Sequence, residues 1–183
     1  MAISVLIVAT IFVKHILDIS VQETSIYIVA AILLILNIIH RIILQQIKKE
    51  DGGKAIRKIK HEIHFQIITD LILLTLILHY SGGVENPLVL FYFFHMIIAS
   101  SIFSTAQSYL YALFAFLLLA SMVLLEYYSV VPHYPLEGFI SANLYQNTVY
   151  VFGAGFVFAC TSTLLVFLSH MIITRSIKTE QTY

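Results

Sequence analysis

Long apolar stretches separated by short polar ones dominate the pattern along the chain. A helix that crosses the hydrocarbon core of a bilayer needs about 20 apolar residues, within a range of about 17–25. Six stretches have this length, and none alternates polar and apolar residues as a strand of a membrane barrel does. They are, approximately, Ile3–Ile19, Ser25–Gln46, Glu62–Tyr80, Pro87–Ser104, Ser108–Tyr128 and Asn147–Ile173. The pattern predicts an all-α polytopic membrane protein, a single six-transmembrane-helix bundle over residues 1–183.

Composition supports this class and argues against several others. Hydrophobic residues make up 60% of the chain and charged residues 11%, with a mean hydropathy of +0.92. Soluble domains carry roughly 25% charged residues, so the polar residues here could not cover a soluble globule. The formal net charge is zero, which argues against nucleic acid as a partner. No nucleophile elbow, Walker A loop, dinucleotide fingerprint or catalytic triad pattern is present, so no residue supports an enzyme.

Basic residues predict how the bundle is oriented. The segment Lys48–Lys60 holds six of the ten lysines and arginines, and such residues concentrate in cytoplasmic loops. We therefore expect a multi-pass protein of the inner (plasma) membrane with both termini in the cytoplasm. Outside the spans we expect a cytoplasmic basic loop at 48–61, an outer loop at 81–87 and a cytoplasmic exit at 174–183. The basic segment either binds anionic lipid head groups or only follows the orientation rule.

The outer loop has a distinctive sequence, GGVENPL at residues 82–88. Gly82 and Gly83 can adopt positive φ and so cap the third span. A residue before proline is disfavoured in the helical region, which suits Asn86 as an N-cap and Pro87 as the first helical residue. The free N–H groups of the fourth helix would then point to the outer interface, where they can donate to an anion or a polarised carbonyl. The alternative is an ordinary turn between two spans.

The stretch GGVENPL resembles the GGxxNPF heptad of the RegB/PrrB-type membrane redox-sensing histidine kinases. In that family a six-span N-terminal domain carries the heptad between its third and fourth spans, and six of the seven positions agree here. The resemblance implies the sensory domain of a two-component histidine kinase. Such a domain binds a quinone at this loop, senses the redox state of the quinone pool, and forms a homodimer. Its signal passes to a cytoplasmic kinase core or a response regulator.

The chain departs from that family at three points. Leu88 replaces the aromatic residue that ends the heptad, which weakens the case for ring stacking on a quinone. Cys160 lies in the last predicted span, where we expect it to be a small core residue, so it does not take the role of the family's cytoplasmic redox-active cysteine. The 183 residues include neither a phosphoacceptor-histidine region nor an ATP-binding domain. We therefore expect the input domain of a sensor, either excised or free-standing.

The resemblance and the neighbouring residues together indicate a set of quinone contacts. This set is Gly82, Gly83, Glu85, Asn86, Pro87, Leu88, Tyr92 and His95. His95 lies about 12 Å below the outer end of the fourth span, with Tyr92 one turn above it on the same face. A histidine there can hydrogen-bond a quinone oxygen or exchange a proton with it. Alternatively, His95 only bonds a nearby hydroxyl or backbone group.

A polar stripe runs along the third predicted span. Glu62, Gln66 and Asp70 repeat at four-residue spacing, which places them on one helix face. Ionisable side chains are costly in hydrocarbon, so we expect the stripe to face the bundle and Asp70 to have a hydrogen-bonding partner. The stripe is either a clamp to Thr or Ser on a neighbouring helix or a proton-responsive element.

Two other functions remain open from the sequence. The eight histidines allow a haem-binding or metal-binding protein, although His61-Glu62-Ile63-His64 lacks the HExxH arrangement of a zinc protease. Asp70 with the histidines also suits a small carrier or channel-like protein. In the last span Gly155, Ala159 and Thr163 form a small-residue face that allows close helix approach, within the chain or across a dimer.

Overall fold

The structure is a computed structural model that describes residues 22–49, 52–136 and 144–180. Helices, turns and a few irregular residues make up this described part of the chain, which contains no strand. The prediction of an all-α protein is confirmed. The first predicted span, Ile3–Ile19, lies outside the described residues.

Among the described residues, four helices are long and apolar enough to cross a membrane. They are α2 (Glu23–Ile47), α3 (Gly53–Tyr80), α5 (Thr105–Tyr127) and α6 (Thr148–Glu180). At 1.5 Å per residue even the shortest is about 35 Å long, more than the roughly 30 Å of a bilayer core. The other helices are η1 (Gly83–Glu85), η2 (Pro87–Leu90), α4 (Phe91–Ile102) and η3 (Leu144–Gln146). The apolar character and length of the long helices indicate a membrane protein.

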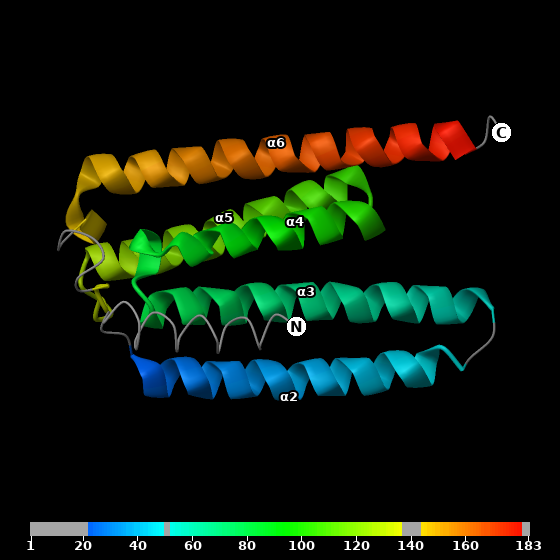
Figure 1. Cartoon of the computed structure of the whole chain (residues 1–183), viewed down its shortest axis with the longest axis horizontal. Helices are drawn as coiled ribbons and strands as arrows, with labels where there is room; N and C mark the ends of the chain where they lie inside the picture. Colours follow the sequence, from blue (N-terminus) through cyan, green and yellow to red (C-terminus); the bar gives the residue numbers. More distant parts are fainter. Residues whose placement is uncertain (1–21, 50–51, 137–143, 181–183) are drawn as a thin grey trace, which may run out of the picture.

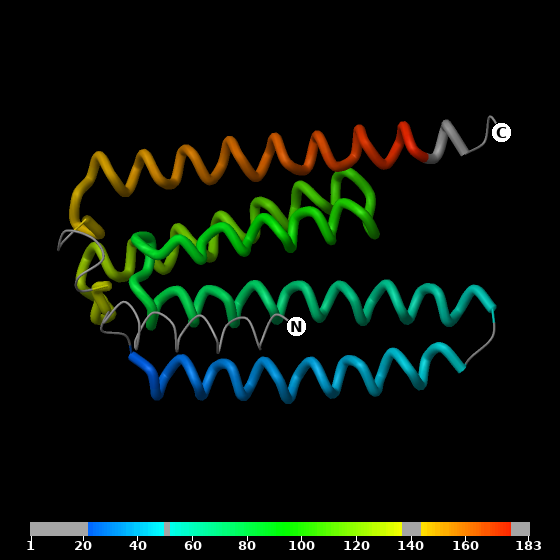
Figure 2. The backbone as a smooth tube through the Cα atoms, in the orientation of Figure 1, coloured from blue at the N-terminus to red at the C-terminus, as the bar shows by residue number. Residues whose placement is uncertain are grey.

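The helices lie side by side along one axis, with α2 and α6 on opposite sides of the bundle (Figures 1 and 2). α2 packs on α3, α3 on α4 and α5, and both α4 and α5 on α6. We call the end formed by η1, η2, η3 and residues 128–136 the heptad end. We call the other end, with the α2–α3 connection and the C-terminus of α6, the basic end. The GGVENPL stretch and the basic segment therefore lie at opposite ends of the bundle (Figure 1).

The basic segment is more helical than its charge pattern predicts. α3 begins at Gly53, inside the predicted loop, so Lys54, Arg57, Lys58 and Lys60 lie in its first turns. Hydropathy marks the part of a helix that suits hydrocarbon, not the point where its hydrogen bonding begins. Lysine, arginine and alanine are good helix formers, which is why the helix extends past the apolar stretch.

The fourth predicted span is the shortest element of the bundle. Its helical part covers Pro87–Ile102, first as η2 and then as α4, and falls below the length of the four long helices. Phe103 is extended, and Ser104 caps α5 through a reciprocal capping box with Gln107. This capping box stabilises the N-terminus of α5 directly after α4 ends. The α4–α5 hairpin therefore stops short of the basic end (Figure 1).

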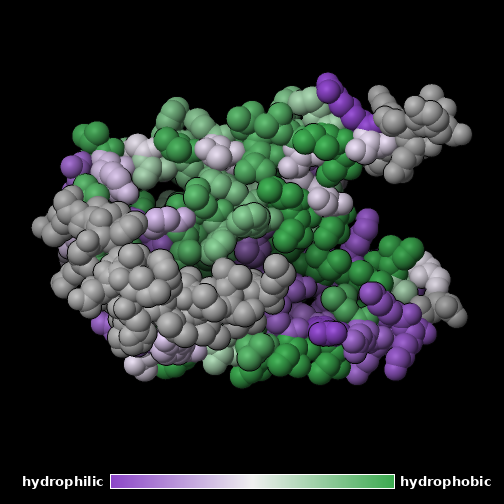
Figure 3. Space-filling view, in the orientation of Figure 1, coloured by the Kyte–Doolittle hydropathy of each residue, from purple (hydrophilic) through white to green (hydrophobic). Residues whose placement is uncertain are grey.

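The interior is apolar and so is most of the exterior. The most deeply buried core residues are Leu71, Leu78, Tyr92, Met96, Ala99, Ala115 and Val166. Large apolar side chains also cover the outside, for example Phe152 and Phe156 on α6 and Ile28 and Ile35 on α2. Figure 3 shows hydrophobic residues over the middle of the bundle and hydrophilic ones gathered at the basic end. Such a surface suits lipid, since exposed apolar patches of this extent are rare on soluble monomers.

One core prediction was wrong. Cys160, expected as a small core residue, is exposed on α6. The helix is apolar on all sides, so hydropathy alone does not distinguish its lipid-facing side from its protein-facing side.

Candidate functional site

The glycine-rich turn after α3 has the backbone that its sequence predicts. Gly82 has φ of 109° and Gly83 has φ of 56°, a region that residues with a Cβ rarely adopt. Asn86 is the N-cap of η2: its Oδ1 accepts from the Leu88 N–H at 2.8 Å, and Pro87 follows it. The Asn86 amide also donates to the Ser81 hydroxyl at 2.7 Å. The predicted capping roles of the loop are confirmed.

Packing also requires both glycines. A Cβ on Gly82 would lie 2.5 Å from the side chain of Leu136, and a Cβ on Gly83 would overlap the carboxylate of Glu126. The turn is therefore pressed against α5 on one side and against the segment that follows α5 on the other.

Glu126 is the centre of a buried cluster of acids and histidines at the heptad end. Its side chain is only 1% exposed. One carboxylate oxygen lies 2.7 Å from Nδ1 of His79, at the end of α3, and the other lies 2.7 Å from Nδ1 of His133. A single carboxylate thus pairs with two imidazoles from distant parts of the sequence.

Glu85 extends the cluster to the heptad loop. Its Oε1 accepts from the backbone N–H of Tyr145 at 2.9 Å, and its Oε2 lies 3.7 Å from Nε2 of His133. The His133 ring stacks on Tyr145, with ring centres 3.9 Å apart and planes at 16°. The His133 Nε2 atom is buried and has no hydrogen-bond partner among the described residues. We call Glu85, Glu126, His79 and His133 the acid–histidine cluster.

Sequence reasoning selected Glu85 and missed the other three members. Glu126 is the one acidic residue of the apolar run Ser108–Tyr128, which is the signal that could have found it. His79 and His133 were considered only as two among eight histidines. No periodic pattern joins residues from a helix end, a 3-10 turn and an irregular segment, so only the fold brings them together.

The remaining predicted quinone residues have contacts within the protein. Tyr92 is completely buried, and its hydroxyl lies 2.6 Å from that of Thr75. His95 Nδ1 lies 3.0 Å from the carbonyl oxygen of Phe91, one turn earlier, which corresponds to the second interpretation made for it. Pro87 is exposed and Leu88 half-buried.

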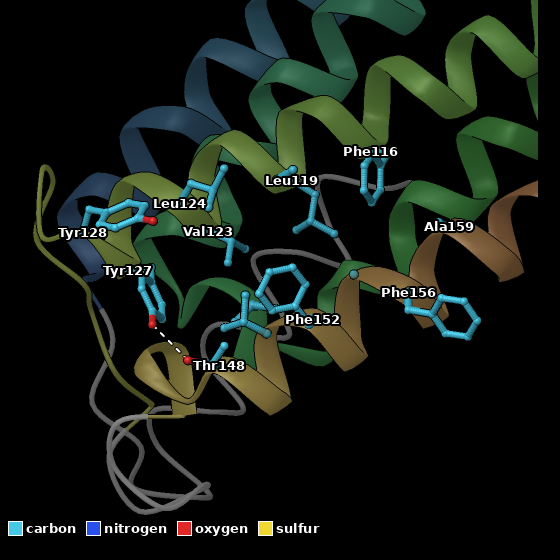
Figure 4. Close-up of a pocket in the computed structure, with 14 residues that line it drawn as sticks. Phe116, Leu119, Val123, Leu124, Tyr127, Tyr128, Thr148, Phe152, Phe156 and Ala159 are labelled. Carbon is cyan, nitrogen blue, oxygen red and sulfur yellow. Dashed lines mark hydrogen bonds between the residues drawn. The ribbon is translucent and has the colours of Figure 1, made fainter.

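An apolar cavity opens between α5 and α6 at the heptad end (Figure 4). Its volume is about 610 Å³. It is lined by Val84, Phe116, Leu119, Ala120, Val123, Leu124, Tyr127, Tyr128, Thr148, Val151, Phe152, Gly155, Phe156 and Ala159. None of the eight predicted quinone residues is in this lining, but Val84 comes from the middle of the heptad loop.

Two features of the cavity bear on what it can hold. At one edge the hydroxyls of Tyr127 and Thr148 lie 3.0 Å apart and form a polar spot on an otherwise apolar wall (Figure 4). Gly155 and Ala159 form part of the wall on α6, and nothing lies within 4 Å of where a Cβ on Gly155 would be. Two members of the predicted small-residue face therefore border open space within this chain, and a helix contact across a dimer stays a prediction.

The polar stripe on α3 faces α2. Glu62 Oε1 lies 2.6 Å from Nδ1 of the buried His40, and the Gln66 amide donates to Asn37 at 3.4 Å. This is the predicted clamp, with histidine and asparagine as partners in place of Thr or Ser. Asp70 is half-buried and makes no side-chain hydrogen bond in the described structure, although its charge interacts with His95 and His40. The partner expected for Asp70 is not found in this part of the chain.

No group of three or more His, Cys, Asp or Glu side chains among the described residues has an arrangement that could hold a metal ion. Comparisons with protein-family models, with curated proteins and with solved structures found no match for this chain.

Proposed function

We propose that the chain is a membrane-embedded sensory domain that binds a quinone in the cavity between α5 and α6. The observation that carries this proposal is the cavity itself, because its volume lies within the roughly 300–1,000 Å³ of ligand pockets and its wall is apolar with one polar spot. The resemblance of residues 82–88 to the quinone-linked heptad supports the choice of ligand.

The chemistry of a quinone fits this lining. A quinone has a flat apolar ring, two carbonyl oxygens that accept hydrogen bonds and an apolar tail. Phe152 and Phe156 offer aromatic faces for the ring or the tail, and the hydroxyls of Tyr127 and Thr148 can turn from each other to donate to a carbonyl. The heptad loop would then act as a wall through Val84. Direct contacts from the eight loop and α4 residues stay a prediction.

Signalling would proceed by a shift between two helix arrangements. Oxidised and reduced quinone differ in their hydrogen-bonding groups, and only a difference in affinity for the two arrangements can move their equilibrium. α6 lines the cavity near its start and continues to the basic end, over 33 residues. A tilt or shift of α6 would therefore reach a cytoplasmic kinase core or a response regulator.

Quinone binding is tested on the purified full chain in lipid nanodiscs. The probe is a photoreactive azido-benzoquinone with a short isoprenoid tail, and mass spectrometry locates the labelled peptides. We expect labels on α5 and α6 near Tyr127 and Phe152, and competition by decyl-ubiquinone but not by a saturated fatty alcohol. Gly155→Leu should fill the cavity and reduce labelling by about tenfold, which corresponds to about 1.4 kcal/mol.

The matched control is Gly153→Leu. Gly153 lies in the same helix, is exposed and also has nothing within 4 Å of its Cβ position, but it does not line the cavity. Both variants make the same change of residue type in α6. Equal labelling of the two variants, or equal competition by the fatty alcohol, would count against a quinone site in the cavity.

The proposal includes six spans with both termini in the cytoplasm and the heptad end outside. Two exposed positions test this orientation in a Cys160→Ser background. Ile56→Cys is in the basic segment and Tyr128→Cys is at the heptad end. In intact cells an impermeant maleimide should label the cysteine at 128 and not the one at 56; the opposite result would invert the topology.

A small proton carrier is the second candidate function, and one observation favours it. Ionisable groups are distributed along the bundle: the acid–histidine cluster at the heptad end, then Asp70 with His95, then His40 with Glu62. Proton uptake into liposomes that contain a trapped pH dye would test this function. Transport should require Asp70, so that Asp70→Asn abolishes it.

A further inference from the structure

We propose that the acid–histidine cluster is a proton-binding site that controls whether the segment Ser129–Leu136 stays attached to the bundle. The site takes protons from the aqueous phase at the heptad end. When its histidines are protonated it holds the segment in place, and when they lose their protons it releases the segment. This inference does not depend on what occupies the cavity between α5 and α6.

The positions of two carboxylates around His133 favour the protonated form of its ring. Its two ring nitrogens each face a carboxylate: Nδ1 lies 2.7 Å from Glu126 and Nε2 lies 3.7 Å from Glu85. An ionised carboxylate only accepts hydrogen bonds, and a neutral imidazole carries one N–H. Only the doubly protonated ring can donate toward both acids. His133 Nε2 is buried and has no hydrogen-bond partner among the described residues, and at 3.7 Å its contact with Glu85 is electrostatic.

The charges within the acid–histidine cluster balance when both histidines are protonated. Two ionised carboxylates and two protonated imidazoles sum to zero within the cluster. The side chains of Glu85, Glu126 and His133 are 1–3% exposed and that of His79 is 14% exposed, so little water is present to screen an unbalanced charge. Loss of the two protons would leave two buried negative charges on either side of one neutral ring, which is a costly arrangement.

The surrounding groups do not replace this balance. Within residues 22–49, 52–136 and 144–180, phenols contact the cluster: Tyr80 and Tyr134 lie beside the His79 ring, Tyr145 stacks on His133, and Tyr150 is near Glu85. Histidine is the side chain that ordinarily changes charge between about pH 5 and 8, and phenols do not.

The cluster also attaches the segment Ser129–Leu136 to the rest of the bundle. Within the described structure, His133 makes the one side-chain hydrogen bond of residues Pro132–Leu136. Tyr145, whose N–H is bonded to Glu85, lies beyond residues 137–143. The cluster therefore joins α3, η1, α5, Ser129–Leu136 and η3 at a single point. Breaking these contacts frees the segment Ser129–Leu136, whose Leu136 side chain packs on Gly82.

Hydrogen exchange of the full chain in nanodiscs, without any quinone, tests the proposal. Peptides that cover residues 128–136 and 144–147 are followed at about pH 5.5 and about pH 8, after correction with unstructured peptides of the same sequence. We expect exchange in these peptides to rise by about tenfold at the higher pH in the wild-type chain, while α3 and α5 interiors do not change. No change in the wild-type chain would overturn the proposal.

Variants then separate proton binding from simple structural support. His133→Gln and Glu85→Gln keep polar side chains of similar size but remove a titrating group or its charge. In both variants, hydrogen exchange in these peptides should no longer depend on pH, whether the segment is held or released. The matched control is His40→Gln, which breaks the histidine–glutamate pair between α2 and α3 and should leave the tenfold response intact. If His40→Gln abolishes the response, or if His133→Gln preserves it, the cluster is not the sensor.

Discussion

Among the described residues, two glutamates hydrogen-bond to histidine, Glu62 and Glu126, and they differ in how many parts of the chain they join. Glu62 has one imidazole partner, His40, 22 residues away on the adjacent helix. Glu126 has two, and through His133 it also faces Glu85. Asp70, which lies on α3 as Glu62 does, has no hydrogen-bond partner in the described part of the chain.

The pair of His40 and Glu62 near the basic end is therefore a helix-to-helix clamp, while the acid–histidine cluster at the heptad end is a junction of several segments. Removing one side of a clamp leaves one unpaired group between two helices that still pack along their length. Removing Glu126 leaves His79 without its carboxylate partner and His133 with only the more distant Glu85, and it removes the hydrogen bond that holds the segment Ser129–Leu136 to α5. The effect of mutation should therefore follow the number of partners of each acid.

The largest effect is expected for Glu126→Ala. Breaking a buried ion pair by removing one partner costs about 3–5 kcal/mol, because the other charge stays buried. Glu62→Ala, which is the same change at the clamp, should cost about 1–2 kcal/mol, since its carboxylate is more exposed and has one partner. Titration with SDS in mixed micelles measures both unfolding free energies. Equal losses in the two variants would remove the distinction between junction and clamp.

The second effect concerns the close approach of the heptad loop to Glu126. Gly83→Ala places a methyl group against that carboxylate and also strains a positive φ. Gly52→Ala is the matched control: its φ is 93°, but nothing lies within 4 Å of its Cβ position. Overpacking typically costs about 1–3 kcal/mol, which should be the difference between the two variants. The same SDS titration measures it, and a smaller loss for Gly83→Ala would contradict the packing argument.

A smaller effect is expected for Asn86→Ala, which removes the cap of η2 and the bond to Ser81. Loss of an N-cap costs about 0.5–2 kcal/mol. Thermal unfolding followed by circular dichroism would show a lowered midpoint. Asn37→Ala removes a side-chain bond to the Leu33 carbonyl inside α2 and the long 3.4 Å bond from Gln66, and it should cost less, because no helix end depends on either bond. The reverse order would show that the loop does not need its cap.

The smallest effect is expected for Asp70→Asn. Its carboxylate gains no hydrogen bond in the described structure, so replacing it with a neutral amide should change the unfolding free energy by less than about 1 kcal/mol, and in the stabilising direction. The SDS titration used for Glu126 tests this. A loss as large as that of Glu62→Ala would indicate that Asp70 has an important partner.

Much of the local structure followed from the sequence. Hydropathy located α2, α5 and the start of α6 to within about three residues, a usual error for boundaries. Gly82, Gly83 and Asn86 have the backbone and capping roles expected of them. These properties depend on residues adjacent in the chain, and therefore adjacent residues suffice to predict them.

The tertiary structure decided which faces meet. Cys160 is exposed, and the sequence does not predict this because α6 is apolar all round and has no polar side that would mark its outward face. Gly155 borders the cavity between α5 and α6, and the shape of this cavity depends on the side chains of both helices. Glu126, His79, His133 and Glu85 come together from the ends of two helices, an irregular segment and a turn. Composition determined that these charges needed partners, since buried charge is costly, but only the packing of distant segments determined which partners they have.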